Sequence, residues 1–302
     1  MEDQATRLRK LVENKAGQRA EEFQPLEGKA ELEDRGTRVI AITSGKGGVG
    51  KTNLTVNLAI ALEKEGQRVV VIDADLGMAN VDVVLGSLSK HHLLNLLEDG
   101  VELSDVLVSG PYGVNYISGG SGIEKAQDFS MADRQRLMQK LSGCGQLADI
   151  VLVDTGAGLG KIVMDFILAA DEVLLVTTPE PTALTDAYAV MKAYSMYATN
   201  KNIKLVVNRV YDETESRDVV AKLQQTSQKF LKMPIECAGY IFEDRNVAGA
   251  VRKQKPFLAW KPSSLASKCV QAMAKSIVYG GDMVVKQGWR GFLRQIFNFS
   301  RK

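Results

Sequence analysis

The stretch GKGGVGKT (Gly45–Thr52) constrains the fold of this chain more than any other feature of its sequence. It matches the pattern G-x-x-x-x-G-K-[ST], follows the apolar run RVIAIT, and opens a segment with helical spacing. Glycines in such a loop let backbone N–H groups approach phosphate groups, and the helix N-terminus adds partial positive charge. The sequence therefore predicts a phosphate-binding loop between a strand and a helix. We expect the loop to contact a nucleotide through Gly45, Lys46, Gly47, Gly48, Val49, Gly50, Lys51, Thr52 and Asn53.

Short apolar runs alternate with longer amphipathic segments over most of the chain. Several runs consist almost entirely of Val, Ile and Leu, which is typical of strands buried on both faces. Such alternation predicts a single α/β domain with a doubly wound, mostly parallel sheet. The expected strands are 38–43, 68–73, 114–118, 149–154, 172–177, 203–209 and 234–241. The expected helices are 51–65, 130–142, 183–199, 213–232 and 263–279.

The expected domain covers residues 37–280, with extensions at both ends. Residues 1–36 combine a short helical segment with a polar stretch that predicts a mobile linker. Residues 281–302 combine a second short linker with an amphipathic helix.

Composition excludes several classes of protein. The formal net charge is +2, so a strongly basic nucleic-acid-binding protein is not expected. The three cysteines are far apart and form no Cys-x-x-Cys pair, which argues against a disulfide framework or a structural zinc site. No run of about 18 apolar residues is present, and the charged N-terminus lacks the apolar core of a signal peptide. A reduced, cytoplasmic setting fits these features.

Two lysines in the phosphate loop have different expected roles. Lys51 should contact the β- and γ-phosphates of ATP, and the Thr52 hydroxyl should bind Mg²⁺. Lys46 is either a solvated side chain or a group that reaches a nucleotide on another subunit. The signature K-G-G-x-G-K-T resembles that of the MinD/ParA group of ATPases, whose Walker A motif is deviant. In that group the first lysine crosses the face of an ATP-bound homodimer, and the resemblance implies this role for Lys46.

Further segments resemble the same group. DADLGMANVD (Asp73–Asp82) is similar to its first switch segment, in which Asp75 would orient the attacking water and help to hold Mg²⁺. LVDTGAG (Leu152–Gly158) looks like the second switch, with Asp154 as the Walker B carboxylate at a strand end. Gly156 departs from the proline that the group often has. The resemblance also implies adenine recognition by Asn208 and stacking of Arg209 on the base.

The last residues, KQGWRGFLRQIFNFSRK, predict an amphipathic helix with a basic polar face. Aromatic and aliphatic residues recur at i, i+3, i+4, i+7 and i+8, and no acidic residue offsets the lysines and arginines. This combination suits the interface of an anionic bilayer, as in MinD-like relatives, whereas packing on the core is the alternative. The residues expected to contact the inner face of the cell membrane are Trp289, Phe292, Leu293, Ile296 and Phe297.

The N-terminal segment DQATRLR (Asp3–Arg9) precedes the predicted linker. It is similar to the D-Q-A-x-x-L-R motif of the FlhG family, also called FleN or YlxH, of MinD-like flagellar-number regulators. In that family the segment docks on the FlhF-type GTPase and stimulates GTP hydrolysis. The residues that match the motif are Asp3, Gln4, Ala5, Leu8 and Arg9.

Together these resemblances imply an ATP-dependent, dimerising ATPase that associates reversibly with the membrane and regulates flagellar number and placement. ATP and Mg²⁺ are the implied cofactors, and Lys46, Lys51 and Asp75 the implied catalytic groups. Flagellar switch-ring proteins and transcription regulators remain open as further partners. The alternatives are a MinD-like regulator of division-site placement, with another partner, and a ParA-like DNA-partition ATPase, which would use a basic surface of the folded domain.

Overall fold

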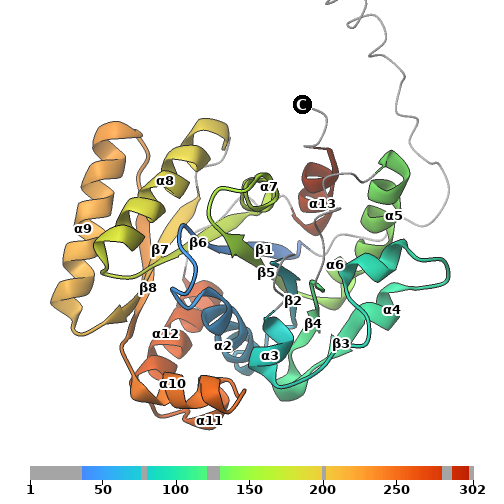
Figure 1. Ribbon diagram of the computed structural model, residues 1–302, viewed down its shortest axis with the longest axis horizontal. Coiled ribbons are helices and arrows are strands. Elements are labelled where there is room, and N and C mark those ends of the chain that lie inside the picture. Colours follow the sequence, from blue (N-terminus) through green and yellow to red (C-terminus); the bar gives the residue numbers. More distant parts are fainter. Residues whose placement is uncertain (1–35, 76–79, 121–129, 199–201, 281–287, 299–302) are drawn as a thin grey trace, which may run out of the picture. The chain divides into compact units, whose positions relative to one another are not determined.

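A computed structural model describes residues 36–75, 80–120, 130–198, 202–280 and 288–298. Its eight strands form one sheet in the order β3-β4-β2-β5-β1-β6-β7-β8, in which only β3 runs antiparallel to its neighbour (Figure 1). The strands are β1 (Arg38–Ser44), β2 (Val69–Ala74), β3 (Leu107–Ser109), β4 (Asn115–Ile117), β5 (Ile150–Ala157), β6 (Glu172–Thr177), β7 (Ile203–Val210) and β8 (Glu236–Phe242).

Helices cover both faces of this sheet. The α-helices are α2 (Lys51–Lys64), α3 (Val81–Leu85), α4 (Leu103–Val106), α5 (Met131–Leu141), α6 (Cys144–Leu147), α7 (Lys161–Ala169), α8 (Pro181–Tyr197), α9 (Glu213–Phe230), α10 (Arg245–Arg252), α11 (Phe257–Trp260), α12 (Leu265–Tyr279) and α13 (Gly288–Asn298). Two short 3₁₀ turns are η1 (Leu93–Leu97) and η2 (Pro111–Gly113). The doubly wound α/β prediction is therefore confirmed.

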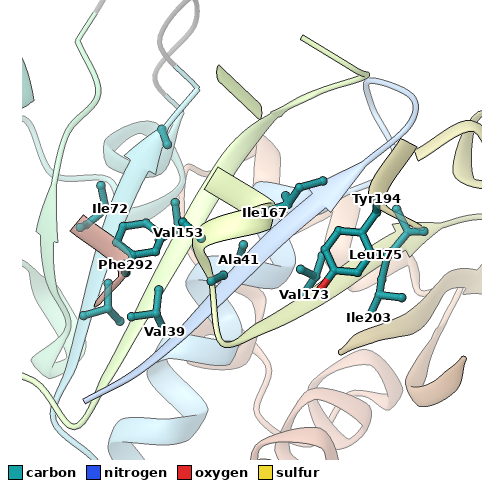
Figure 2. Packing of buried hydrophobic residues seen from close by; sticks show 14 of the residues in the cluster. Val39, Ala41, Ile72, Val153, Ile167, Val173, Leu175, Tyr194, Ile203 and Phe292 are labelled. Atoms are coloured by element: carbon teal, nitrogen blue, oxygen red, sulfur yellow. The ribbon is translucent and has the colours of Figure 1, made fainter. Parts of the chain in front are cut away.

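Two hydrophobic cores lie on the two faces of the sheet. One contains side chains of α2, α3, α10, α11 and α12, and the other contains side chains of α5 to α9 and of α13. Figure 2 shows the second core, where Phe292 of α13 lies among Ile72, Val153 and Val39 from three neighbouring strands. The C-terminal helix is thus part of the packed domain rather than an appendage.

The predicted strands and helices are present with small shifts at their ends, and a few elements were not predicted. β3 has three residues, and α3, α10 and α11 are helices of four to eight residues. Segments this short carry too few apolar positions to show a period, so tertiary contacts decide their conformation. The nine-residue helix α7 was also missed, because its run IVMDFILA resembles a buried strand as much as a helix.

Among the described helices, none is both long and apolar enough to cross a bilayer. The N-terminal motif and nearly all of the expected linkers at residues 10–36 and 281–288 lie outside the described residues, and Gly288 is the first residue of α13.

Candidate functional site

Three central strands bring the candidate site together at one edge of the sheet. β5 lies between β1 and β2, and Asp154 of β5 pairs in register with Asp73 of β2 and with Ile42 of β1. Because parallel strands end at the same edge, the phosphate loop after β1 meets the carboxylates of β2 and β5 there. This is the topological reason why motifs about 100 residues apart become neighbours.

The phosphate loop has the conformation that its glycines allow. Gly48 and Gly50 adopt φ values of 78° and 96°, in the left-handed region that other residues avoid. A Cβ atom added at Gly47 or Gly48 would meet nothing within 4 Å, so open space lies beside the loop. Gly50 precedes α2 without a side-chain cap, which leaves the first N–H groups of the helix for an anionic ligand. The loop can therefore cradle a phosphate chain.

Gly45 and Gly50 also allow close packing of the loop against the rest of the domain. A Cβ atom at Gly45 would lie 2.3 Å from the backbone of Asp186 in α8. A Cβ atom at Gly50 would lie 2.4 Å from Nδ2 of Asn208, which donates to the Val49 carbonyl over 2.7 Å. Asn208 thus braces the loop, and its role in adenine recognition stays a prediction. Arg209 follows with φ 59° at the end of β7 and is exposed.

Asp154 is the buried centre of the site. Thr52 and Thr55 donate hydroxyl hydrogen bonds of 2.6 and 3.0 Å to its two oxygens, and Lys51 Nζ lies 3.7 Å from Oδ1. Burial raises the pKa of Asp154, and the Lys51 ammonium and the two hydroxyls oppose that rise. The carboxylate, the Thr52 hydroxyl and the phosphate cradle are adjacent, as the phosphate-loop and Walker B predictions require.

The first switch segment is anchored by a residue that the sequence analysis did not assign. The Asp73 carboxylate accepts N–H bonds from Asp75, Asn80 and Val81 at 2.8–3.1 Å. It therefore ties both sides of residues 76–79, which lie outside the described residues. Its place in the DAD motif was the available signal, but the motif alone could not show which aspartate faces inward.

Asp75 lies next to the second switch. A Cβ atom on Gly156 would be 3.6 Å from Asp75 Oδ1, and the Asp75 charge contributes to the raised pKa of Asp154. Two carboxylates and one hydroxyl are the hard oxygen ligands that Mg²⁺ prefers. Thr52, Asp75 and Asp154 therefore fit a magnesium ion beside the phosphate cradle. At position 156, a Cβ atom would make only ordinary van der Waals contact with Asp75, so this contact does not require glycine there.

Lys46 does not point into its own cradle. Its Nζ donates to Glu180 Oε2 at 3.0 Å and to Thr182 Oγ1 at 2.9 Å, at the N-terminal end of α8. Both charged side chains are about half exposed. The two loop lysines are thus separated in space, Lys51 toward the buried Asp154 and Lys46 toward the surface. Glu180 and Thr182 were not predicted, because nothing in the sequence links α8 to the phosphate loop.

Three of the five residues expected at a membrane are buried in the protein in this structure, and the other two, Ile296 and Phe297, are partly buried against the same core. Trp289, Phe292 and Leu293 are 1–2% exposed, and α13 contacts α5, α6, α7 and β1. The Trp289 indole donates to the Leu141 carbonyl over 2.6 Å, and the Phe292 ring stacks on Phe166 of α7 at 6.1 Å between centroids. The amphipathic pattern was predicted correctly, and the structure shows the face packed on the core, which was the alternative.

Asp73 makes the stability of the nucleotide-free protein depend on pH. Desolvation raises its pKa to about 7 from an ordinary value near 3.8, so the folded protein holds a proton that the unfolded chain has lost. We expect the free energy of unfolding to fall by about 2–4 kcal/mol as pH rises from 4 to 7 and to level off above that. Urea unfolding across this range checks the prediction, and Asp73→Asn should flatten the curve. If the free energy of unfolding of Asp73→Asn depends on pH as steeply as that of the unchanged chain, the prediction is wrong.

Comparisons with known proteins agree with this geometry. Residues 40–257 match the CobQ/CobB/MinD/ParA nucleotide binding domain. The chain is 41% identical over 240 residues to the antiactivator FleN of Pseudomonas aeruginosa, covering 80% of this chain and 86% of FleN. It is 34% identical to the flagellum site-determining protein YlxH of Helicobacter pylori, covering 87% and 90% of the two chains. Among solved structures, the septum site-determining protein MinD of Pyrococcus horikoshii, complexed with Mg-ADP, superposes with a TM-score of 0.64 at 28% identity, covering 83% of this chain and 99% of MinD.

Proposed function

This chain belongs to the MinD/ParA family of nucleotide-binding proteins, within its FleN/YlxH branch, and from this premise we propose that it is a Mg²⁺-dependent ATPase that regulates flagellar number and placement. One observation carries the ATPase proposal: Lys51, Thr52, Asp75 and Asp154 converge beside an open phosphate cradle, while Lys46 faces outward. One copy of the chain can bind the nucleotide at this site. The site lacks a cation from Lys46, however, and a second copy of the chain would supply it.

The chain's own residues would divide the chemistry as follows. The loop N–H groups and Lys51 bind the phosphates, and Thr52, Asp75 and Asp154 hold Mg²⁺, which neutralises charge on the phosphate oxygens when bound. Asp75 lies beside Gly156 and near Asp154, and its carboxylate would orient the attacking water molecule. Lys46 leaves Glu180 and reaches the phosphates of the second copy. Phosphoryl transfer depends mainly on such positioning and charge stabilisation.

Nucleotide state would control membrane binding through α13. The second switch runs from the end of β5 into α7, and α7 holds Phe292 through Phe166. A shift of α7 when the switch closes on ATP would therefore loosen the seat of α13. The docked state already leaves Gln295 Oε1 buried without a hydrogen-bond partner among the described residues. Released, the same apolar face and the exposed Arg290 and Arg294 suit an anionic bilayer.

Co-sedimentation with anionic vesicles tests the membrane part of the proposal. The full chain should bind vesicles in ATP and much less in ADP, because two released helices on one dimer bind with avidity. A chain ending at Gly280 should not bind in either nucleotide. In a Trp260→Phe background, Trp289 is the remaining tryptophan, and its emission should change with ATP as the helix leaves its buried seat. Equal vesicle binding in ATP and ADP would contradict the switch.

A substitution in α7, which packs against α13, should release α13 while the sequence of α13 itself stays unchanged. Phe166→Ala removes the ring that stacks on Phe292, a loss of about 1.5–2 kcal/mol. We expect at least about tenfold more vesicle binding in ADP, approaching the ATP value of the unchanged chain. Phe230→Ala on α9 is the matched control, since that ring is 63% exposed and far from α13 in sequence and packing. If both variants bind vesicles like the unchanged chain, docking does not limit release.

The flagellar part of the proposal rests on FleN and YlxH and on the motif at residues 3–9. We propose that this segment docks on an FlhF-type GTPase and stimulates it. A peptide of residues 1–20 should raise the GTPase rate, and a Gln4→Ala, Leu8→Ala peptide should not. Without stimulation, the ATPase and membrane switch would stand, and a MinD-like role at the division site would become the better proposal.

A further inference from the structure

Charge is distributed very unevenly along this chain. From Arg245 to Lys302 the sequence contains twelve lysines and arginines and one acidic residue, Asp282. The whole chain has 38 basic and 36 acidic residues, so the first 244 residues carry 26 basic and 35 acidic ones. The last fifth of the chain is therefore strongly basic, although the net charge of the whole chain is close to zero. Part of this region is α13, and the larger part is α10, α11 and α12.

Six basic residues of α10 to α12 and the turns between them have exposed side chains. Lys261, Lys268 and Lys275 are seven residues apart, so the last two share one side of α12 and Lys261 precedes its first turn. Arg252, Lys253 and Lys255 extend this surface across the end of α10. None of these six forms an ion pair with any residue that the structure describes. We call these six residues the basic face.

Apolar groups lie within the basic face. The Trp260 ring is partly exposed, with Lys253 and Lys261 at 5.6 and 5.8 Å from its centroid. Val251 and Leu265 are 47% and 55% exposed. Exposed aliphatic side chains gain nothing from a nucleic-acid backbone, whereas a lipid interface accepts lysines, tryptophan and aliphatic groups together. The mixture favours an anionic lipid surface over nucleic acid.

The position of the basic face relates it to α13. Helix α12 belongs to the core on the α2 side of the sheet, and α13 is docked on the other side. Lys275 lies five residues before Gly280, and seven residues separate Gly280 from α13. Seven residues can span at most about 23–25 Å. Docked α13 and the basic face therefore lie on opposite sides of the sheet. Once α13 is released, the segment of seven residues is long enough for α13 to reach a bilayer that the basic face also contacts.

We propose that the basic face of α10 to α12 is a second contact with the anionic membrane, engaged when α13 is released, and that it orients the ATPase domain on the bilayer. This inference rests on the proposed membrane switch. Each lysine near an anionic surface strengthens binding about fivefold at low salt, so three of them change affinity by on the order of 10²-fold. Screening should reduce the effect at high ionic strength.

The test compares two triple variants of the full chain in ATP. Lys261→Gln, Lys268→Gln, Lys275→Gln removes three of the six charges of the basic face, and Lys192→Gln, Lys222→Gln, Lys229→Gln makes the same charge change at exposed positions of α8 and α9. Binding is measured by flotation with vesicles of phosphatidylcholine and 30% phosphatidylglycerol at low and high salt. The first variant should bind on the order of 10²-fold more weakly at low salt, with a smaller difference at high salt. The control should bind like the unchanged chain.

The outcomes separate this inference from the function on which it rests. If a chain ending at Gly280 keeps its vesicle binding, the α13 switch itself fails. If that truncation abolishes binding but both triple variants bind equally, the basic face is no membrane contact and the switch stands. If the basic-face variant keeps vesicle binding but loses affinity for a 30-base-pair DNA duplex, the surface binds nucleic acid and the inference is overturned. ATP-dependent dimerisation, measured alongside, should be unchanged in both variants.

Discussion

Lys46→Ala is expected to lower the rate of ATP hydrolysis by about 10³-fold or more while ATP binding by the monomer persists. The reason is geometric: Lys51 already faces the buried Asp154, whereas Lys46 points away from its own cradle toward Glu180 and Thr182. A cation supplied in trans stabilises transition-state charge, and such groups are worth 10³–10⁵ in rate. Phosphate release reports hydrolysis, a fluorescent ATP analogue reports binding, and light scattering after size exclusion reports dimers.

Glu180→Gln is the matched variant for this measurement. It removes the exposed ion pair that holds Lys46 in the monomer, which is worth at most about 1 kcal/mol. Because two such pairs open for each dimer formed, we expect it to strengthen ATP-dependent dimerisation by no more than about 30-fold. An Lys46→Ala protein that dimerises and hydrolyses ATP normally would show that Lys46 is only a surface partner of α8.

Asp75→Asn should separate ATP binding from hydrolysis. Asp75 lies beside Gly156 of the second switch, and we expect its carboxylate to orient the attacking water molecule. Loss of that group should reduce hydrolysis by about 10²–10⁴-fold. Because Lys46 is intact, the ATP-bound dimer should persist and stay on vesicles without release. Single-turnover hydrolysis and vesicle release after ATP addition measure the two effects.

Asp82→Asn provides the control for this second substitution. Asp82 belongs to the same segment, but it lies in α3 and its carboxylate accepts from Val83 and Ser118, away from the cradle. Its hydrolysis rate should stay within a factor of two or three of the unchanged chain. Equal loss in both variants would mean that disturbing the segment, rather than removing the water-orienting carboxylate, stops the reaction.

Local sequence patterns were sufficient to predict much of the fold and of the phosphate-binding site of this protein. The phosphate loop is a contiguous motif, and the buried strands on either side of it are continuous apolar runs. Strand–helix alternation then restricts the topology, which places Asp154 beside Thr52. These predictions succeed because each depends on neighbouring residues or on a general rule of parallel sheets. The amphipathic period of α13 was readable for the same reason.

Local patterns could not predict which side chains from distant parts of the sequence contact one another. Asp73 was passed over because its role depends on which way the side chain of a strand end points. Glu180 was missed because α8 reaches Lys46 only after β6 has been placed beside β1. The basic surface of α10 to α12 was masked by a net charge near zero, since composition averages the two ends of the chain.

The sequence by itself determined the nucleotide-binding fold, the residues of the phosphate loop and the existence of an amphipathic C-terminal helix. These follow from short-range periodicity and from a motif whose chemistry is local. Only the tertiary structure decided where the apolar face of that helix lies, because an apolar face is stabilised equally by a lipid interface and by a protein groove. The groove exists only once α5, α6 and α7 have packed over the sheet, and there it buries Trp289, Phe292 and Leu293.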